Sequence, residues 1–270
     1  KAENGDVNLS LIATPGDTIN LTNYDKNSPD YLLDKQKREK LFSQMTKELG
    51  FSILPGTPHE GRTSGFNGFL VLLDFNFVGI NNEKDYWKRT VEGGSADSTF
   101  SVAELTMRKG FPNSFEISAG FSQVLGTDLS SVHAAFTMAL LEGFIYVPDL
   151  SITPKIAGLA GINDLNLVSG GIDFVLSKRF TVQNIVKLIP SLAFSIYGVY
   201  ANTGQILPAI ENIDPIEKSE VFERGFNEDG LGRKFQVGLF AGYLRGGIKV
   251  SYAYEFNGMY SVSSGLTFRY

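Results

Sequence analysis

The chain is dominated by long segments in which apolar residues alternate strictly with small or polar ones. Segment 247–256 shows the pattern clearly. Because successive side chains of a β-strand point to opposite faces, a period of two residues predicts strands whose faces meet different environments. One face of this segment is apolar and the other is small or charged: Ile248, Val250, Tyr252, Tyr254 and Phe256 against Lys249, Ser251, Ala253 and Glu255.

Ten segments of this kind follow one another up to the last residue. Most contain about 11 to 15 residues, whereas globular strands usually have about five or six and tilted membrane-spanning strands need about 9–11. The pattern therefore predicts an all-β fold, a closed antiparallel transmembrane β-barrel of about ten strands. Twelve strands are the alternative, with the extra ones drawn from 5–22 or 203–233. The predicted strands are roughly 66–80, 99–109, 114–125, 131–143, 149–160, 164–178, 191–203, 234–244, 246–257 and 258–270.

Composition excludes several function classes. The chain has no Cys, which rules out thiol catalysis, disulfides and Cys-based zinc sites. The net charge of -5 comes without a basic stripe, so no nucleic acid partner is predicted. No strand is followed by a phosphate-binding glycine loop and a helix. We predict no cofactor and no metal.

The end of the chain resembles a known family. The last predicted strand carries Phe268 and Tyr270 on its apolar face and stops there. With the long alternating strands and the absence of Cys, this ending resembles the bacterial outer-membrane β-barrel proteins of the small porin-like superfamily, over about 66–270. The resemblance implies that Phe268 and Tyr270 form the signal recognised by the outer-membrane insertion machinery. It also implies that outer-membrane lipid and lipopolysaccharide surround the barrel.

The predicted connections fall at two ends of the barrel. The long ones, 81–98 and 203–233, lie at the same end. Membrane barrels have short periplasmic turns and longer external loops. With ten strands, both chain termini are therefore expected in the periplasm.

Residues 1–65 lack the alternation and are predicted as a separate segment. Ser28 and Pro29 suit the start of a helix that runs to about Leu49, with Gly50 just past its end. A short strand is expected from Asn8 to Ile12. The segment resembles the N-terminal hatch of fatty-acid transporters, which predicts a plug entering from the periplasmic side. The alternative is a helix that hangs in the periplasm, packed on its own chain or on an envelope protein partner.

The face opposite the apolar one is predicted to line the lumen. Acidic and basic residues nearly balance there, so no ring of one sign is expected, as a strongly selective pore would have. Two functions remain open: passage of small solutes through the lumen, or a sealed structural barrel that anchors envelope partners through 1–65 or the external loops. The lumen-facing candidates are Asp74, Asn76, Glu104, Arg108, Glu116, His133, Lys155, Asp173, Lys249, Glu255 and Arg269.

Catalysis is not predicted. His133 is followed by Ala134 and Ala135, so the His-x-Ser motif of outer-membrane phospholipases is missing. The sequence also lacks the Asp-x-His pattern that omptin-type proteases would require. A lone inward histidine is more simply a hydrogen-bonded polar residue of the lumen.

Overall fold

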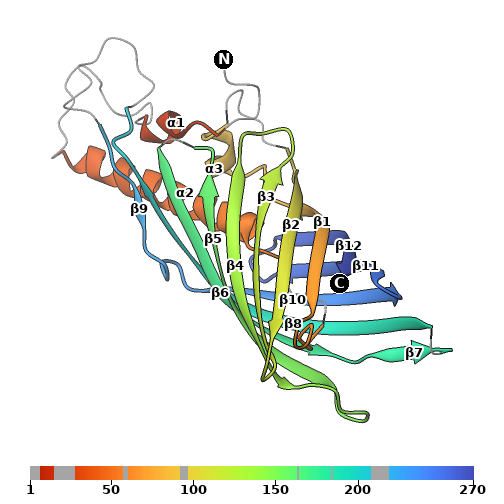
Figure 1. Cartoon of the computed structure of the whole chain (residues 1–270). Helices are drawn as coiled ribbons and strands as arrows, with labels where there is room; N and C mark the ends of the chain where they lie inside the picture. The colour runs from red at the N-terminus through yellow and green to blue at the C-terminus, as the bar shows by residue number, and fades with distance from the viewer. Residues whose placement is uncertain are drawn as a thin grey trace.

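A computed structural model of the chain describes residues 7–14, 28–56, 60–91, 97–162, 164–183, 185–207 and 219–270. It is an antiparallel β-barrel with a long helix at one end (Figure 1). Two further short strands, β7 (Phe180–Val182) and β9 (Glu223–Arg224), pair with β8. The barrel strands are β1 (Phe69–Gly79), β2 (Thr99–Phe111), β3 (Phe115–Val124), β4 (Ser130–Leu141), β5 (Asp149–Ala160), β6 (Leu165–Ser177), β8 (Val186–Thr203), β10 (Gly232–Tyr243), β11 (Gly246–Glu255) and β12 (Tyr260–Arg269).

The barrel closes between its first and last strands. Leu70 of β1 is paired with Arg108 of β2 on one side and with Arg269 of β12 on the other. The predicted closed ten-stranded barrel is thus confirmed. The twelve-stranded alternative is wrong for the described residues, because β9 is a two-residue strand beside β8 and α1 (Leu9–Ala13) is a helix.

One strand begins earlier than predicted. β8 starts at Val186 instead of residue 191. Its first residues are paired on both sides, since Val186 lies opposite Val182 of β7 and Tyr243 of β10. The two ladders hold this stretch extended although its sequence alternation is weak.

The two ends of the barrel differ. One end, the C-terminal rim, holds the start of β1, Tyr270 and the connections β2–β3, β4–β5, β6–β8 and β10–β11. The other, the loop end, holds the connections β1–β2, β3–β4, β5–β6, β8–β10 and β11–β12. The two long connections, from β1 to β2 and from β8 to β10, both leave and re-enter the barrel at the loop end, as predicted.

The faces of the strands are divided as the alternation predicts. In β4, Val132 is 65% exposed whereas its neighbour His133 is 5% exposed. In β11, Ile248 and Val250 are exposed while Lys249 is buried. The apolar residues therefore face outward and the charged ones face the enclosed centre.

The long helix α2 (Pro29–Ile53) begins where the sequence places it. Ser28 is the N-cap and accepts a hydrogen bond from the Tyr31 amide, and Pro29 follows it. The predicted end is wrong, because the helix runs through Gly50 to Ile53. A Cβ at position 50 would stand 2.3 Å from Val199 Cγ2, so this glycine serves close packing rather than termination.

The expected strand from Asn8 to Ile12 is also wrong. These residues belong to the start of α1, and Asn8 is its N-cap, accepting a hydrogen bond from the Ser10 amide. Side-chain capping of this kind favours a helix start over a strand. No helix in the described part of the chain is long and apolar enough to cross a membrane.

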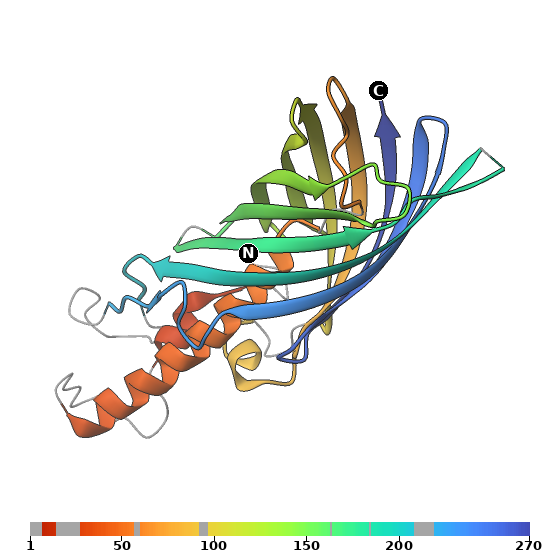
Figure 2. The ribbon, with the colours of Figure 1, turned by 90° about the horizontal axis from the view of Figure 1, so that it is seen from below.

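The N-terminal part lies at the loop end. Val7 forms a β-bridge with Val91, next to α3 (Asp85–Lys88), whereas Tyr270 pairs with Phe69 at the C-terminal rim. Figure 2 shows α2 and the C-terminus at opposite ends of the barrel. The expectations that the helix sits on the side of the C-terminus, and that both chain ends share one side, are wrong for the described residues. The helix is held at the loop end because its apolar side packs there.

Candidate functional site

The charged side chains of the lumen form buried ion pairs between strands. Asp74 Oδ2 lies 2.7 Å from Lys249 Nζ, and Asp173 Oδ2 lies 2.8 Å from Lys155 Nζ. Arg108 and Glu116 form a third pair. A buried charge is costly unless it is paired, so these contacts explain how the lumen tolerates its charges.

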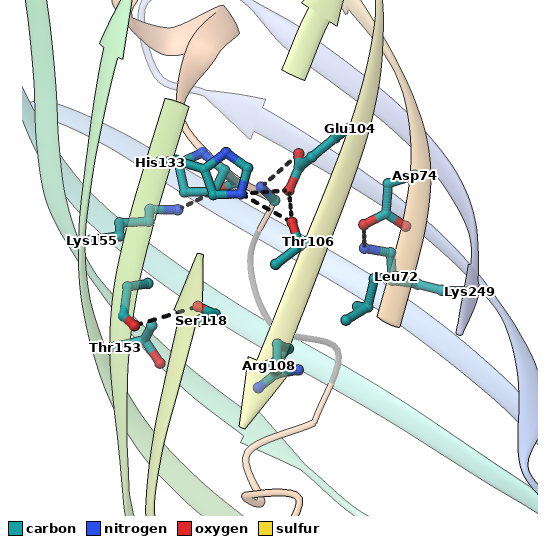
Figure 3. Close-up of a pocket in the computed structure, with 13 residues that line it drawn as sticks. Leu72, Asp74, Glu104, Thr106, Arg108, Ser118, His133, Thr153, Lys155 and Lys249 are labelled. Atoms are coloured by element: carbon teal, nitrogen blue, oxygen red, sulfur yellow. Dashed lines mark hydrogen bonds and ion pairs between the residues drawn. The ribbon is translucent and has the colours of Figure 1, made fainter. Parts of the chain in front are cut away.

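A hydrogen-bonded cluster lies beside these pairs (Figure 3). Thr106 Oγ1 donates to Glu104 Oε1 over 2.9 Å and lies 3.0 Å from His133 Nε2. His133 Nε2 is 3.7 Å from the same carboxylate oxygen. The Asn76 amide also donates to Glu104, over 3.3 Å. The histidine thus has a structural setting among β1, β2 and β4.

The described residues between α2 and β1 run through the lumen to the rim. We call residues 54–56 and 60–68 the plug segment. Near its start, the carbonyl of Pro55 accepts a hydrogen bond from Lys155 Nζ (3.0 Å), and the amide of Gly56 donates to Glu104 Oε2 (3.3 Å). The lumen-facing charges therefore bind backbone groups of the plug segment as well as one another.

The second half of the plug segment binds side chains near the C-terminal rim. The amide of Gly61 donates to Ser177 Oγ over 2.8 Å, and that of Ser64 donates to Glu116 Oε2 over 2.8 Å. Thr63 donates through both its amide and its hydroxyl to Glu142, each over 3.0 Å. These contacts place the second described part of the plug segment, residues 60–68, at the C-terminal rim.

Charged side chains of the plug segment form ion pairs at the same rim. Arg62 lies 3.2 Å from Asp149 Oδ1. Glu60 lies 2.7 Å from Arg179 through one oxygen and 3.6 Å from Arg269 through the other. Sequence analysis missed Glu60, Glu142 and Asp149, because they lie in connections or at strand ends, where alternation gives no signal.

The loop end is closed by an apolar core. Phe42, Met45 and Leu49 of α2 are fully buried. They pack in one cluster with inward residues of the barrel mouth, including Val102 and Val199. Burial of such side chains stabilises by about 1.5–3 kcal/mol each, so the helix closes this end firmly.

Glu48 joins the helix to the β1–β2 connection. Its carboxylate accepts hydrogen bonds from Trp87 Nε1 and from Tyr86 Oη, each over 2.6 Å. The amide of Asn81 also donates to it, over 3.3 Å. Burial, together with the neighbouring carboxylate, raises the pKa of the Tyr86 phenol well above its ordinary value, so Tyr86 remains a donor.

A second polar contact joins α2 to the β8–β10 connection. Arg38 lies 2.5 Å from Glu220 and 2.7 Å from Asp34, and it also donates to the carbonyl of Ala13 over 3.0 Å. Burial lowers the pKa of Arg38, but Glu220 and Asp34 outweigh it and raise that pKa above the ordinary value. Arg38 therefore stays charged in its buried position.

One small cavity lies between Pro55, Gly56 and the inward strand residues. The cavity in Figure 3 gives about 30 Å³ to the centres of water molecules and is lined by Pro55, Gly56 and inward strand residues. A single water needs about 10–15 Å³ on this measure. The cavity therefore has room for water but not for an organic solute.

The structure places the predicted lumen residues on the inner face. Arg269 differs from the others, with its side chain 32% exposed at the C-terminal rim. Glu255 lies at the loop end and accepts a hydrogen bond from the Asn257 amide over 2.6 Å. Phe268 and Tyr270 are exposed on the outside of the rim. The buried ones are Asp74, Glu104, Arg108, Glu116, His133, Lys155, Asp173, Lys249 and Glu255.

A closed antiparallel barrel with an apolar exterior and a charged interior defines a transmembrane β-barrel. The chain is similar to several solved structures. They include the KdgM porin (11% identity over 73% of this chain and 98% of that one, TM-score 0.32). Another is the COG4313 outer membrane channel from Pseudomonas putida F1 (8% identity over 80% of this chain and 100% of that one, TM-score 0.41). A third is Ail of Yersinia pestis (13% identity over 76% of this chain and 99% of that one, TM-score 0.26). No protein-family model and no curated protein matches the chain.

Proposed function

We propose that the protein is an outer-membrane barrel for the passage of small solutes, held closed by its own N-terminal chain. The observation that carries the proposal is the plug segment, which is hydrogen-bonded inside the lumen to Lys155, Glu104 and Glu116. In this proposal α2 acts as a lid on the loop end. The C-terminal rim faces the periplasm and the loop end faces outward.

Two features favour a removable closure over a solid core. The barrel ladder is complete without the plug segment, since β1 pairs with both β2 and β12. The plug segment itself is held mainly by hydrogen bonds and ion pairs, and water that enters the lumen can replace these partners; hydrogen bonds to charged groups contribute about 1.5–3 kcal/mol each. Displacing it would leave a lumen lined by paired charges and small residues.

The test is conductance in planar lipid bilayers. The full chain is expected to show little current, and a variant lacking residues 1–65 is expected to show clearly more. Circular dichroism and the heat-dependent gel shift of folded barrels would verify that the shortened chain has folded. Absence of current from both folded proteins would overturn the proposal.

A scaffold function is the second candidate, and one observation favours it. The first turns of α2 expose Leu32 and Leu33, which are 48% and 56% accessible. Figure 2 shows this part of α2 extending beyond the barrel. An envelope protein partner that binds there should co-purify after gentle detergent extraction and be lost from a Leu32→Ser, Leu33→Ser variant. Recovery of the bare barrel from cells in both cases would count against this function.

A further inference from the structure

Cations gather inside the C-terminal rim. A small cavity there is lined by Lys187, Arg245 and Arg269, and Glu60 supplies its one carboxylate among the described residues. Arg179 adds a fourth cation, because it binds Glu60 over 2.7 Å. Four cations therefore surround a single carboxylate that comes from the plug segment.

The rest of the lumen is arranged differently. Elsewhere, several charges of the lumen form separate pairs of one cation and one carboxylate, as in Asp74 with Lys249 and in Asp173 with Lys155. In the described residues, neither Lys187 nor Arg245 lies within ion-pair distance of a carboxylate. Around this cavity, the cations of the described residues therefore outnumber the carboxylates.

The cavity gives only about 20 Å³ to the centres of water molecules, so an anion must take the place of the Glu60 carboxylate rather than lie beside it. The ring of Phe240 forms part of its wall, lying so close to Gly242 and Gly247 that a Cβ at either position would come within 2.6 Å of the ring. Glu60 is buried, whereas the side chains of Arg179 and Arg269 are partly exposed. The two arginine side chains are thus partly accessible from outside while they hold the carboxylate.

We propose that this cavity is a binding site for soluble multivalent anions of the phosphate or polycarboxylate class, in which Glu60 is the resident anion. An arriving anion competes with Glu60 for the arginines, since both present oxygens that match a guanidinium. Loss of the Glu60 contacts then loosens the rim end of the plug segment. This second step rests on the proposed function, whereas binding itself does not.

Binding is tested by isothermal titration of inorganic phosphate and of citrate into the full chain in detergent. In the double variant Lys187→Gln, Arg245→Gln, anion binding is expected to weaken about tenfold, because charge-assisted contacts are lost. Glu60→Gln is expected to strengthen it by a similar factor, because the internal competitor loses its charge. Lys109→Gln is the matched control. Lys109 lies at the same rim, but it follows the inward Arg108 in β2, so its side chain faces outward, away from the cavity. Equal affinities in all variants would overturn the site.

The source of the anion is tested in lipid nanodiscs. Phosphate binding is expected to be the same in phosphatidylcholine and in phosphatidylglycerol discs. Loss of binding only in the anionic discs would assign the site to lipid headgroups and overturn the soluble ligand. Conductance with and without citrate then tests whether the anion loosens the plug segment. If citrate binds but leaves the current unchanged, the loosening step is overturned. Absence of current from every variant would refute the proposed function but leave the titration result standing.

Discussion

Gly50 of α2 lies against Val199 of β8 so closely that the helix and the barrel wall allow no side chain between them. Gly50→Ala is therefore expected to push the lid helix outward and destabilise its docking by about 1–3 kcal/mol, as overpacking does. The measurement is the rate at which protease cleaves α2, together with bilayer conductance. Val199→Ala in the same chain removes the clashing methyl groups and should restore protection. A double variant as sensitive as Gly50→Ala alone would refute this account.

Removing the acceptor at Glu48 should weaken the same lid. Glu48→Ala leaves Trp87 Nε1 and Tyr86 Oη without their partner, and an unsatisfied buried donor costs about 1–3 kcal/mol. Trp87 fluorescence is expected to shift to longer wavelength as water reaches the indole. Glu39→Gln, a change on the exposed side of α2, is the control and should leave the spectrum unchanged. An unshifted spectrum for Glu48→Ala would contradict the prediction.

The buried pair of Arg38 and Glu220 should show strong coupling. Arg38→Met leaves Glu220 buried without its charged partner, and breaking such a pair costs about 3–5 kcal/mol. The double variant with Glu220→Gln should recover part of that loss, because no uncompensated charge remains. A double-mutant cycle on the unfolding of the N-terminal chain measures the coupling. Strict additivity would show that the pair does not hold the lid.

Lys155 has two roles that substitution can separate. It neutralises Asp173 and donates to the carbonyl of Pro55 in the plug segment. In Lys155→Met, conductance is expected to rise. Adding Asp173→Asn should restore the thermal stability of the barrel without restoring closure, because the Pro55 contact is still missing. If the double variant closes like the parent chain, Lys155 does not act on the plug segment.

The two outward aromatic residues at the end of β12 should affect assembly. In the double variant Phe268→Ser, Tyr270→Ser, insertion by the outer-membrane machinery is expected to slow several-fold, while spontaneous folding in detergent changes little. The yield of heat-modifiable barrel in membranes with and without the machinery is the measurement. Phe256→Ser, an equally outward aromatic at the loop end, is the matched control. Equal insertion rates for the two variants would remove the special role of the C-terminus.

The barrel was predictable because lipid and lumen impose opposite demands on neighbouring residues. Val132 and His133 differ in polarity, and the structure separates them to opposite faces. The same logic located the ion-pairing residues Asp74 and Lys249, although it did not pair them, because register depends on strand order and shear.

The N-terminal chain was harder to predict for physical reasons. Gly50 has the sequence signature of a helix end, and only the nearby Val199 explains why the helix continues. The plug segment binds through backbone amides such as those of Gly61 and Ser64, and every residue type except proline carries this donor. Its position inside the barrel therefore leaves no pattern in its composition.

The pairing of Leu70 with Arg269 has a consequence for the order of assembly. The seam between β1 and β12 is the contact that joins the two ends of the strand array. The residues just before β1 are already surrounded by strands, and α2 lies at the far end. A helix is about 10–12 Å across with its side chains, too wide to be threaded afterwards through an interior that side chains fill. The N-terminal chain must therefore be laid across the open sheet before the seam forms, and the barrel is then wrapped around it.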